Sequence, residues 1–546
     1  MPALRKESLL SHPATTLKEF LRERAGKSAE SPLLVGERPL SYGAFAREVH
    51  RAANALLRAG VKKGDKIALL LPNCPEFLVI VFAAAEIGAV FVPVNTAFTA
   101  EEARYVLDHS ESTLLITTQA FLPLVDQIRG NCPHLKQVIS LKRDKEPGCL
   151  SWDEFLFDVS GDLPEVAVRP GEIASITYTS GTTDHPKGVM LTQYAYLFAP
   201  QKRAEALGWS DKDRALVVLP LFHVNALCHT ALALMSVGGS MLLREKFSAS
   251  HFWDDVREVG ATTSSLMRTI PQILMNLPER LDDGKSSLRL VVALLAPELH
   301  CRFEERFNLT VVPTYSLTED ILSVVGPLDK ARRKLGSCGL PVAPAVHKLR
   351  ILSEGGAECA PGQLGEIVKQ SPAVMKGYYK NPQATSEALK SGWLYTGDLG
   401  YLDGDGFLYF VDRKKDMVKR GDENISSEEV ERVLNSHPLI AESAVIGVPD
   451  PIRQEEVKAC IVLKPQEVKA CIVLKPQATP ETLPPEEIWD FCQTHLAPFK
   501  IPRYLEYRES LPKTPSSKIQ KGALRTEPEL SKETVFDRVA REKKSG

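Results

Sequence analysis

The chain has 546 residues, of which 44% are hydrophobic and 25% are charged, and its formal net charge is −2. This length excludes a single ordinary core and predicts two to four folding units, while the composition is that of a globular protein. The near-neutral charge gives no electrostatic reason to expect nucleic acid or an anionic membrane as the main partner.

The longest apolar stretch, residues 77–94, contains Glu86, Gly88 and Pro93, which favours a buried helix followed by a strand over a membrane span. Arg5 and Lys6 are not followed by a continuous apolar run, so we expect no cleaved secretory signal. The ten cysteines are scattered without a CxxC pair, which argues against a disulfide framework or a zinc site. We therefore expect a cytoplasmic protein.

Segments rich in Val, Ile, Leu and Ala alternate with helical stretches through most of residues 1–400. One such series is a strand that ends near residue 73, a helix over 74–88 and a strand over 89–95. The alternation predicts an α/β fold, in which a large N-terminal domain has helix-covered, largely parallel sheets. The active site is expected at the ends of the sheets.

A domain boundary is predicted where a short strand at 409–412 runs into the charged segment DRKKD, residues 412–416. A smaller mixture of helices and strands follows, which predicts a mobile α+β domain. We place the boundary after residue 413, so that the two domains are 1–413 and 414–546. A solvated turn is the alternative interpretation of the charged segment.

An exact duplication lies in the smaller domain, where residues 456–466 read EVKACIVLKPQ and residues 467–477 repeat them. Repeat architectures have longer periods and recur at least three times, so the duplication does not indicate a solenoid. We expect one copy to form a core strand and the other an edge hairpin or an irregular bulge.

A candidate phosphate loop, TYTSGTTDHPKG at residues 177–188, follows a β-prone run. Hydroxyl side chains, glycines and one lysine, Lys187, are the groups needed to hold a polyphosphate, although a Ser/Thr/Gly loop can also be a plain turn. Pro186 stands where the Walker pattern has glycine, so that pattern is excluded. With its Pro-Lys-Gly ending, the segment resembles the adenylate-forming superfamily of acyl-CoA synthetases, luciferases and peptide-synthetase adenylation domains.

The resemblance extends over residues 15–527, because further family motifs occur in the family's order. PLFH, ending at His223, resembles the aromatic-histidine segment beside the acyl pocket and the pantetheine tunnel. His223 is therefore a candidate catalytic residue, and a packed Phe-His pair is the alternative interpretation.

YSLTE at 315–319 resembles the family motif Tyr-Gly-x-Thr-Glu. This implies Tyr315 against adenine, Thr318 near the α-phosphate and Glu319 on Mg²⁺, whereas a helix cap is the alternative interpretation of the Thr-Glu pair. One carboxylate beside phosphate oxygens is a common arrangement for Mg²⁺.

Motifs later in the chain imply contacts to the ribose and a hinge. GWLYTGD ends at Asp398, which the resemblance places on the ribose hydroxyls, and a carboxylate can accept hydrogen bonds from both. Arg413 matches the second ribose contact, and Lys415 falls at the interdomain hinge. Gly421 matches the segment that approaches coenzyme A, and LPKTPSSKI matches the loop that carries the adenylation lysine, here Lys518.

The remaining candidate site residues belong to the phosphate loop. The resemblance assigns the ATP phosphates to Thr179, Ser180, Gly181, Thr182, Thr183 and Lys187, and makes Thr182 the second metal ligand beside Glu319.

Several positions depart from the family pattern, since they lack a glycine that the family usually has: Asp184, Leu294, Leu295, Ser316, Asp422 and Ser517. Leu294 and Leu295 lie in the loop that should form the floor of the adenine and acyl pockets. Their side chains reduce the space in these pockets and the freedom of the backbone compared with glycine. At Asp422 the added carboxylate is expected to slow the coenzyme A step.

The resemblance implies an AMP-forming acyl-CoA ligase with ATP, Mg²⁺ and coenzyme A as cofactors. Segments such as FWDDV at 252–256 look most like bacterial fatty-acid and carnitine or crotonobetaine CoA ligases, which favours an aliphatic acid. The expected partner is a small carboxylic acid, with a homodimer as a further candidate. A stand-alone carrier-protein-loading adenylation enzyme and a nucleotide-binding pseudoenzyme remain as alternatives.

Overall fold

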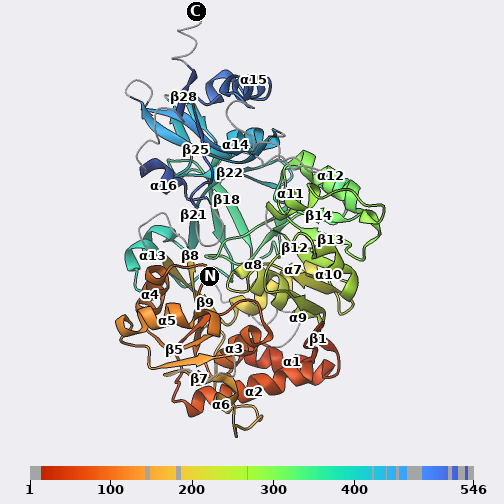
Figure 1. Ribbon diagram of the computed structural model, residues 1–546, viewed down its shortest axis with the longest axis vertical. Coiled ribbons are helices and arrows are strands. Elements are labelled where there is room, and N and C mark those ends of the chain that lie inside the picture. Colours follow the sequence, from red (N-terminus) through yellow and green to blue (C-terminus); the bar gives the residue numbers. More distant parts are fainter. Residues whose placement is uncertain are drawn as a thin grey trace, which may run out of the picture. The chain divides into compact units, whose positions relative to one another are not determined.

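The structure is a computed structural model that describes residues 14–141, 148–179, 186–266, 269–420, 423–437, 439–450, 454–463, 483–513, 519–526 and 535–538 (Figure 1). The predicted site residues Ser180, Gly181, Thr182, Thr183, Gly421 and Lys518 lie outside the described residues, as do Asp184, Asp422 and Ser517.

The chain divides into two compact units. The first comprises Met1–Arg350, Val368–Thr396 and Leu402–Tyr409, and the second comprises Ile351–Ile367, Gly397–Tyr401 and Phe410–Gly546. The chain passes from one unit to the other within four strands: β18 (Lys348–Leu352), β19 (Gly365–Gln370), β21 (Trp393–Leu402) and β22 (Leu408–Arg413). The predicted boundary after residue 413 stays a prediction.

One sheet of the first unit has the strand order β7-β6-β5-β3-β4-β8-β9. Strands β7 to β8 run parallel to their neighbours, and β9 runs antiparallel to β8. The strands are β3 (Lys66–Leu70), β4 (Val90–Pro93), β5 (Ser112–Thr117), β6 (Gln137–Ser140), β7 (Leu150–Ser151), β8 (Ile173–Thr179) and β9 (Lys187–Thr192). The helices in this part are α3 (Pro75–Glu86), α4 (Ala100–His109), α5 (Leu122–Ile128) and α6 (Trp152–Phe155).

Helix α3 is buried on every side, since each residue from Phe77 to Glu86 is buried. A helix that is apolar all round belongs in a core or a membrane. The one charged side chain of this buried stretch, Glu86, pairs with His50, and the His50 Nδ1 atom lies 3.0 Å from the Glu86 carboxylate. The expected buried helix followed by a strand is confirmed. Within the described ranges, no helix combines the length and the apolar composition needed to span a bilayer.

The other large sheet of this unit has the order β14-β13-β12-β10-β11-β1-β2. Its neighbours run parallel from β14 to β1, and β2 is antiparallel to β1. The strands are β1 (Pro32–Leu34), β2 (Leu40–Ser41), β10 (Arg214–Val217), β11 (Ser240–Leu243), β12 (Thr263–Ser265), β13 (Leu290–Val292) and β14 (Thr310–Val312). The helices are α1 (Leu17–Ser28), α2 (Tyr42–Arg58), α7 (Ala195–Ala206), α8 (Val224–Ala226), the π-helix η4 (Leu227–Leu232), α9 (Ala233–Val237), α10 (Phe252–Val259), α11 (Thr269–Met275) and α12 (Pro297–Phe307).

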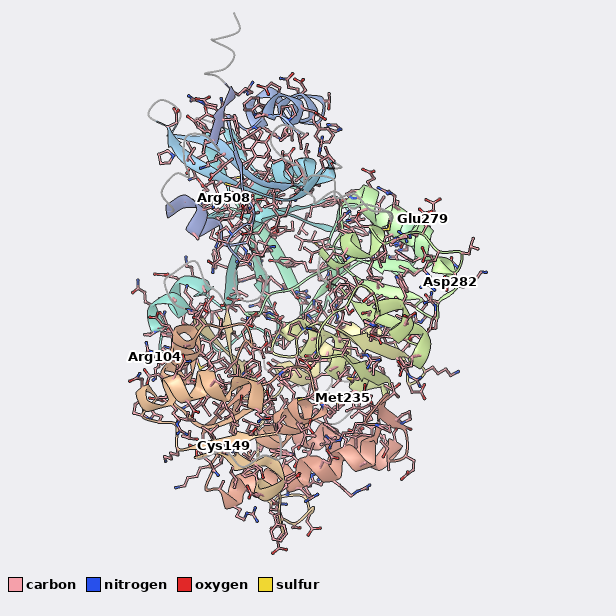
Figure 2. The ribbon with its side chains drawn as sticks, in the orientation of Figure 1. Arg104, Cys149, Met235, Glu279, Asp282 and Arg508 are labelled. Atoms are coloured by element: carbon pink, nitrogen blue, oxygen red, sulfur yellow. The ribbon has the colours of Figure 1, made fainter. Side chains whose placement is uncertain are left out.

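Helix α2 illustrates how the pattern of apolar residues places these helices. Its buried residues include Phe45, Val49, Ala52 and Leu56, whose spacing forms one apolar stripe, and the Ser41 side chain caps its first turn. Helix α2 packs against α1 and α3 (Figure 1). Together with fully buried residues such as Met235 (Figure 2), these helices form the core of the first unit.

A small antiparallel sheet in the first unit carries the YSLTE segment. It has the order β15-β16-β17, with β15 (Thr314–Tyr315), β16 (Val324–Val325) and β17 (Leu340–Pro341). Residues 316–323 form the loop between β15 and β16, which we call the motif loop. Helix α13 (Pro382–Ala388) and strand β20 (Leu389–Lys390) also belong to this unit.

The second unit has a mixed sheet with its own core. The order is β24-β23-β26-β27-β28, with β25 paired to β26, and the pair β26–β27 is parallel while the others are antiparallel. The strands are β23 (Val418–Arg420), β24 (Glu423–Ile425), β25 (Ile440–Asp450), β26 (Gln454–Leu463), β27 (Tyr504–Tyr507) and β28 (Val535–Asp537), and the helices are α14 (Ser427–Ser436), α15 (Pro485–His495) and α16 (Lys521–Thr526). The predicted fold class, a large α/β part with largely parallel sheets and a smaller α+β part, is confirmed.

The first copy of the duplicated segment forms most of β26, a strand with neighbours on both sides. Val457, Ala459 and Ile461 are fully buried and belong to the core of the second unit. The expectation that one copy forms a core strand is confirmed for the first copy, and the second copy lies outside the described residues.

Deleting residues 467–477 should leave folding intact, because the first copy already fills the core position and a shorter connection changes the loop entropy only slightly. We expect the melting temperature to change by less than about 2 °C and adenylation to be retained. Calorimetry of the deletion variant and the wild type measures the difference. A fall of ten degrees or more would show that the second copy is part of the core.

Candidate active site

The ends of the candidate phosphate loop are held by paired strands. Thr179 is the last residue of β8 and Lys187 the first of β9, and the two residues face each other in the antiparallel register. Both are half-buried at the end of the sheet. Thr179 and Lys187 therefore lie side by side at a sheet end, where the sequence predicts the active site.

A short segment, residues 375–379, runs alongside β9. The Lys376 amide donates to the Met190 carbonyl over 2.9 Å, and the Tyr379 amide donates to the Gly188 carbonyl over 2.7 Å. Gly377 has φ +138°, and a Cβ there would lie 2.7 Å from the Thr385 methyl group, so glycine is required. The segment thus carries Tyr378 to the start of β9.

Tyr378 joins two of the predicted site residues. Its hydroxyl donates to Glu319 Oε1 over 2.9 Å, and Lys187 Nζ lies 5.2 Å from the centroid of its ring. The Met375 amide also donates to the Glu319 carbonyl over 2.8 Å. Lys187 and Glu319, which the sequence places in separate motifs, therefore meet at one aromatic ring. Sequence reasoning missed Tyr378, since a tyrosine pair after a glycine is equally typical of a packed core.

The carboxylate of Glu319 suits a magnesium ion that is also bound by phosphate oxygens. It is half-buried, and among the described residues no side chain or amide donates to Oε2 in addition to the bond at Oε1. In the described ranges no three His, Cys, Asp or Glu side chains converge into a metal site. Mg²⁺ commonly keeps several waters and takes one or two carboxylates plus phosphate oxygens, so a single carboxylate here fits that ion.

A buried arginine from helix α7 holds both ends of the motif loop. Arg203 of α7 is fully buried, and its Nη1 donates to Thr314 Oγ1 over 3.0 Å and to Ser323 Oγ over 2.9 Å. Burial lowers the pKa of Arg203 to about 10, which leaves it charged at neutral pH. The Arg203 guanidinium therefore links strand β15, which precedes the motif loop, to Ser323, the last residue of that loop.

His229 of the π-helix η4 contacts the middle of the motif loop. Its Nε2 donates to the Ile321 carbonyl over 2.7 Å, and its Nδ1 lies 3.5 Å from the hydroxyl of Ser316, one of the positions that lack the family's glycine. Burial, with the nearby cation of Arg203, lowers the pKa of His229 to about 3. The imidazole is therefore neutral and acts as a hydrogen-bond donor to the loop backbone.

A buried ion pair follows Glu319 directly in the chain. Lys369 Nζ lies 3.0 Å from Asp320 Oδ2 and donates to the Leu322 carbonyl over 2.9 Å, and both charged side chains are fully buried. Burial acts to raise the pKa of Asp320, but Lys369, His347 and the Ser371 hydroxyl together outweigh it, so the pKa lies below its usual range. Lys369 Nζ also lies 5.6 Å from the ring centroid of the buried Tyr315. Thr318 is half-buried in the same loop.

His223 lies at the start of α8 and is half-buried. Its ring centroid is 4.6 Å from that of the buried Phe222. The preceding turn is held by Asn73, whose amide group donates to the Leu219 carbonyl over 2.9 Å and accepts from the Leu221 amide over 2.7 Å. The structure thus contains the packed Phe-His pair, and the catalytic role of His223 stays a prediction.

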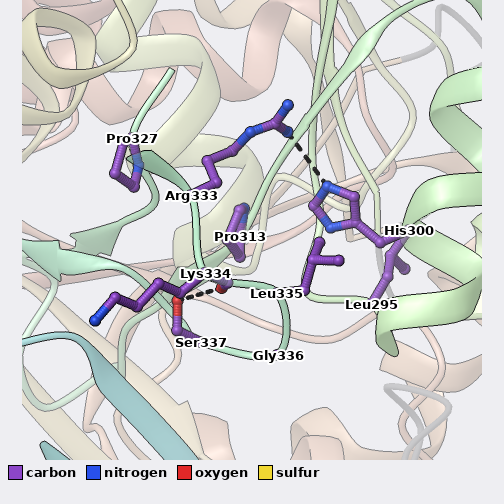
Figure 3. A pocket seen from close by; sticks show the side chains of 9 residues that line it. All are labelled: Leu295, His300, Pro313, Pro327, Arg333, Lys334, Leu335, Gly336 and Ser337. Atoms are coloured by element: carbon purple, nitrogen blue, oxygen red, sulfur yellow. Dashed lines mark hydrogen bonds between the residues drawn. The ribbon is translucent and has the colours of Figure 1, made fainter. Parts of the chain in front are cut away.

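The loop with the two leucines in place of glycines borders a small hollow, shown in Figure 3. Leu295 lines it together with His300 and Arg333, whose Nη1 lies 3.3 Å from His300 Nε2. Its volume of ≈ 10 Å³ suits about one water molecule and no substrate. Leu295 is buried and Leu294 half-buried, so both occupy space that glycines would leave open.

In the second unit, Asp398 and Arg413 lie side by side. Arg413 Nε is 3.3 Å from Asp398 Oδ1, the carboxylate is buried, and the guanidinium is about half exposed. The neighbouring Asp412 is buried at the start of α14, where it accepts hydrogen bonds of 2.7 Å from the amide and the hydroxyl of Ser427. A carboxylate is favoured at a helix N-terminus, so this contact anchors the strand end that carries Arg413.

The predicted hinge residue Lys415 follows in an exposed turn. Its carbonyl accepts a hydrogen bond from Arg525 over 3.3 Å, and Arg525 also lies 3.2 Å from the Asp416 carboxylate. The structure therefore places Asp398, Arg413 and Lys415 in one unit and Thr179, Lys187, His223, Tyr315, Thr318 and Glu319 in the other.

The sequence matches two family models. Residues 21–379 match the model described as AMP-binding enzyme, and residues 429–518 match its C-terminal domain. The chain is 37% identical over 496 residues to a crotonobetaine/carnitine–CoA ligase of Salmonella arizonae, covering 89% of this chain and 93% of that protein. Identity to the enzyme of the same name from Salmonella typhimurium is 35% over 528 residues, covering 93% and 98%.

Solved structures of similar fold are acyl- and aryl-CoA ligases. The anthranilate CoA ligase AuaEII, in complex with anthranoyl-AMP, has a TM-score of 0.85 at 27% identity, with 94% of this chain and 96% of that chain covered. The o-succinylbenzoate CoA synthetase of Bacillus subtilis, in complex with AMP, has a TM-score of 0.80 at 29% identity, with 94% and 99% covered. The chain belongs to the AMP-binding enzyme family, and within it to the AMP-forming acyl-CoA ligases.

Proposed function

We propose that this ligase activates a small aliphatic carboxylic acid with ATP and Mg²⁺ and transfers the acyl group to coenzyme A. The observation that carries the proposal is the meeting of Lys187 and Glu319 at the ring of Tyr378. The aliphatic substrate is supported by relatives whose names are crotonobetaine/carnitine–CoA ligase. The ATP and Mg²⁺ requirement is supported by a solved complex of the Bacillus subtilis relative with ATP and a magnesium ion.

In the proposed first half-reaction, a carboxylate oxygen of the acid attacks the α-phosphorus of ATP. The bond to the bridging oxygen breaks, and pyrophosphate leaves with its electron pair. Lys187 and the phosphate loop hold the polyphosphate, so the rate gain comes from positioning and from preorganised positive charge. Glu319 and Thr182 would hold magnesium, which would supply further positive charge beside the leaving pyrophosphate.

The other predicted residues have roles that suit their chemistry. Asp398 and Arg413 would hold the ribose, since a carboxylate accepts from both hydroxyls and Arg413 fixes that carboxylate through the 3.3 Å contact. Tyr315 and Thr318 would contact the adenine and the α-phosphate. Lys518 would bind the carboxylate and the α-phosphate during adenylation.

In the proposed second half-reaction, the coenzyme A sulfur attacks the acyl carbonyl carbon and AMP leaves. The thiol proton is released to a base or to water. His223 and Gly421 would lie along the path of the thiol, and Lys415 would be the hinge between the two steps.

We also propose that the enzyme acts in the cytoplasm. We further propose that it forms a homodimer, and light scattering at several protein concentrations can measure this oligomeric state.

A pyrophosphate-release screen tests the proposed function. Short, medium and long aliphatic acids and aromatic acids are compared, each with and without coenzyme A and with Mg²⁺ present or chelated. We expect release only with Mg²⁺, highest turnover with an aliphatic acid, and acyl-CoA as the final product. Adenylate that accumulates without thioester would favour the carrier-loading alternative, and ATP binding without release for any acid would favour the pseudoenzyme.

A further inference from the structure

We infer that Tyr378 is a positioning residue for adenylation, which sets the orientation of the Glu319 carboxylate for the metal and holds Lys187 beside it. The inference rests on the proposed function, since it assigns Tyr378 a role toward Mg²⁺ and the phosphates. It is carried by the two contacts that Tyr378 makes with residues from separate motifs.

The hydroxyl acts on the carboxylate. It donates to Glu319 Oε1 over 2.9 Å and so occupies one of the two carboxylate oxygens. The carboxylate is then held in one rotation about its terminal bond, with Oε2 left to face a cation. Partners that hydrogen-bond to metal-binding side chains orient those side chains, and their loss commonly lowers metal affinity by about 10- to 100-fold.

The ring acts on the lysine. Lys187 Nζ lies 5.2 Å from the ring centroid, within the range in which an ammonium group is attracted to an aromatic face. A lysine side chain has many rotamers, and this contact lowers the entropy that is lost when Lys187 binds phosphate. The hydroxyl and the ring therefore have separable effects, the first on metal binding and the second on ATP binding.

The backbone fixes Tyr378 independently of its side chain. Its amide donates to Thr385 Oγ1 over 2.9 Å, and the residue forms an isolated bridge with Val189 of β9. The next residue, Tyr379, points its hydroxyl to Glu111 over 2.8 Å, and Glu111 also lies 2.9 Å from Lys380. Removing the Tyr378 hydroxyl should thus leave the segment in place, and Tyr379 offers a matched control in the same segment.

The test measures acid-dependent ATP–pyrophosphate exchange against Mg²⁺ concentration in Tyr378→Phe, Tyr378→Leu and Tyr379→Phe. In Tyr378→Phe we expect the Mg²⁺ concentration at half-maximal rate to rise about tenfold, with kcat at saturating Mg²⁺ within about twofold of wild type. In Tyr378→Leu the KM for ATP should rise as well, because the ring is lost. Tyr379→Phe should leave both Mg²⁺ and ATP dependence unchanged.

Tyr378→Phe is also combined with Glu319→Ala, where its effect on the Mg²⁺ dependence should vanish because the carboxylate is gone. An unchanged Mg²⁺ dependence in Tyr378→Phe would overturn the inference, and so would an equal shift in Tyr379→Phe or an undiminished shift in the double variant. Melting temperatures separate these results from misfolding. Absence of exchange in the wild type for every acid would instead contradict the proposed function.

Discussion

Lys518→Ala should lower acid-dependent ATP–pyrophosphate exchange by about a hundredfold or more, because it removes one charge-assisted contact that is made mainly in the transition state. The same variant should still convert supplied acyl-adenylate and coenzyme A to thioester, since the proposed role of Lys518 is confined to adenylation. The two half-reactions are measured separately, by exchange of labelled pyrophosphate and by single-turnover thioester formation.

Lys513 provides the matched control for this experiment. It lies five residues before Lys518 in the same Pro- and Ser-containing segment, and its ammonium group pairs with Glu442 over 2.7 Å at a partly exposed site. Lys513→Ala should change both half-reactions by less than about twofold, because exposed ion pairs contribute little. Equal loss of both half-reactions in Lys518→Ala would reject the assigned role.

Lys369→Met should destabilise the first unit by about 3–5 kcal/mol, because it leaves the Asp320 carboxylate buried without its cation. Both side chains are fully buried at a separation of 3.0 Å, and Lys369 also holds the Leu322 carbonyl. The motif loop that carries Glu319 should loosen at the same time, so adenylation should fall together with stability. The shift in the midpoint of urea unfolding and the exchange rate measure the two effects.

Two comparisons sharpen this prediction. Lys334→Met breaks partly exposed pairs with Asp403 and Asp405, and it should shift the urea midpoint far less than Lys369→Met does. Adding Asp320→Leu to Lys369→Met should recover a large part of the stability, because replacing both buried charges removes the unpaired carboxylate. If Lys369→Met unfolds at the same urea concentration as the wild type, the pair has no stabilising role.

Much of the fold could be predicted from sequence, because the relevant signals are local. Alternating apolar segments predicted the parallel sheets, and the all-apolar stretch at 77–94 predicted the buried helix α3 and the strand β4. The order of the motifs predicted the family and named Lys187 and Glu319. It could not predict that these residues meet, because they lie on separate strands and loops.

The sequence by itself determined the fold class and the reaction class, and it named candidate residues for the site. Only the tertiary structure decided what holds those residues: Tyr378 between Lys187 and Glu319, and the buried Arg203, His229 and Lys369 around the motif loop. Such residues carry no local signal, because a buried polar side chain is stable only through partners that are distant in sequence. Those partners come together only when the chain has folded.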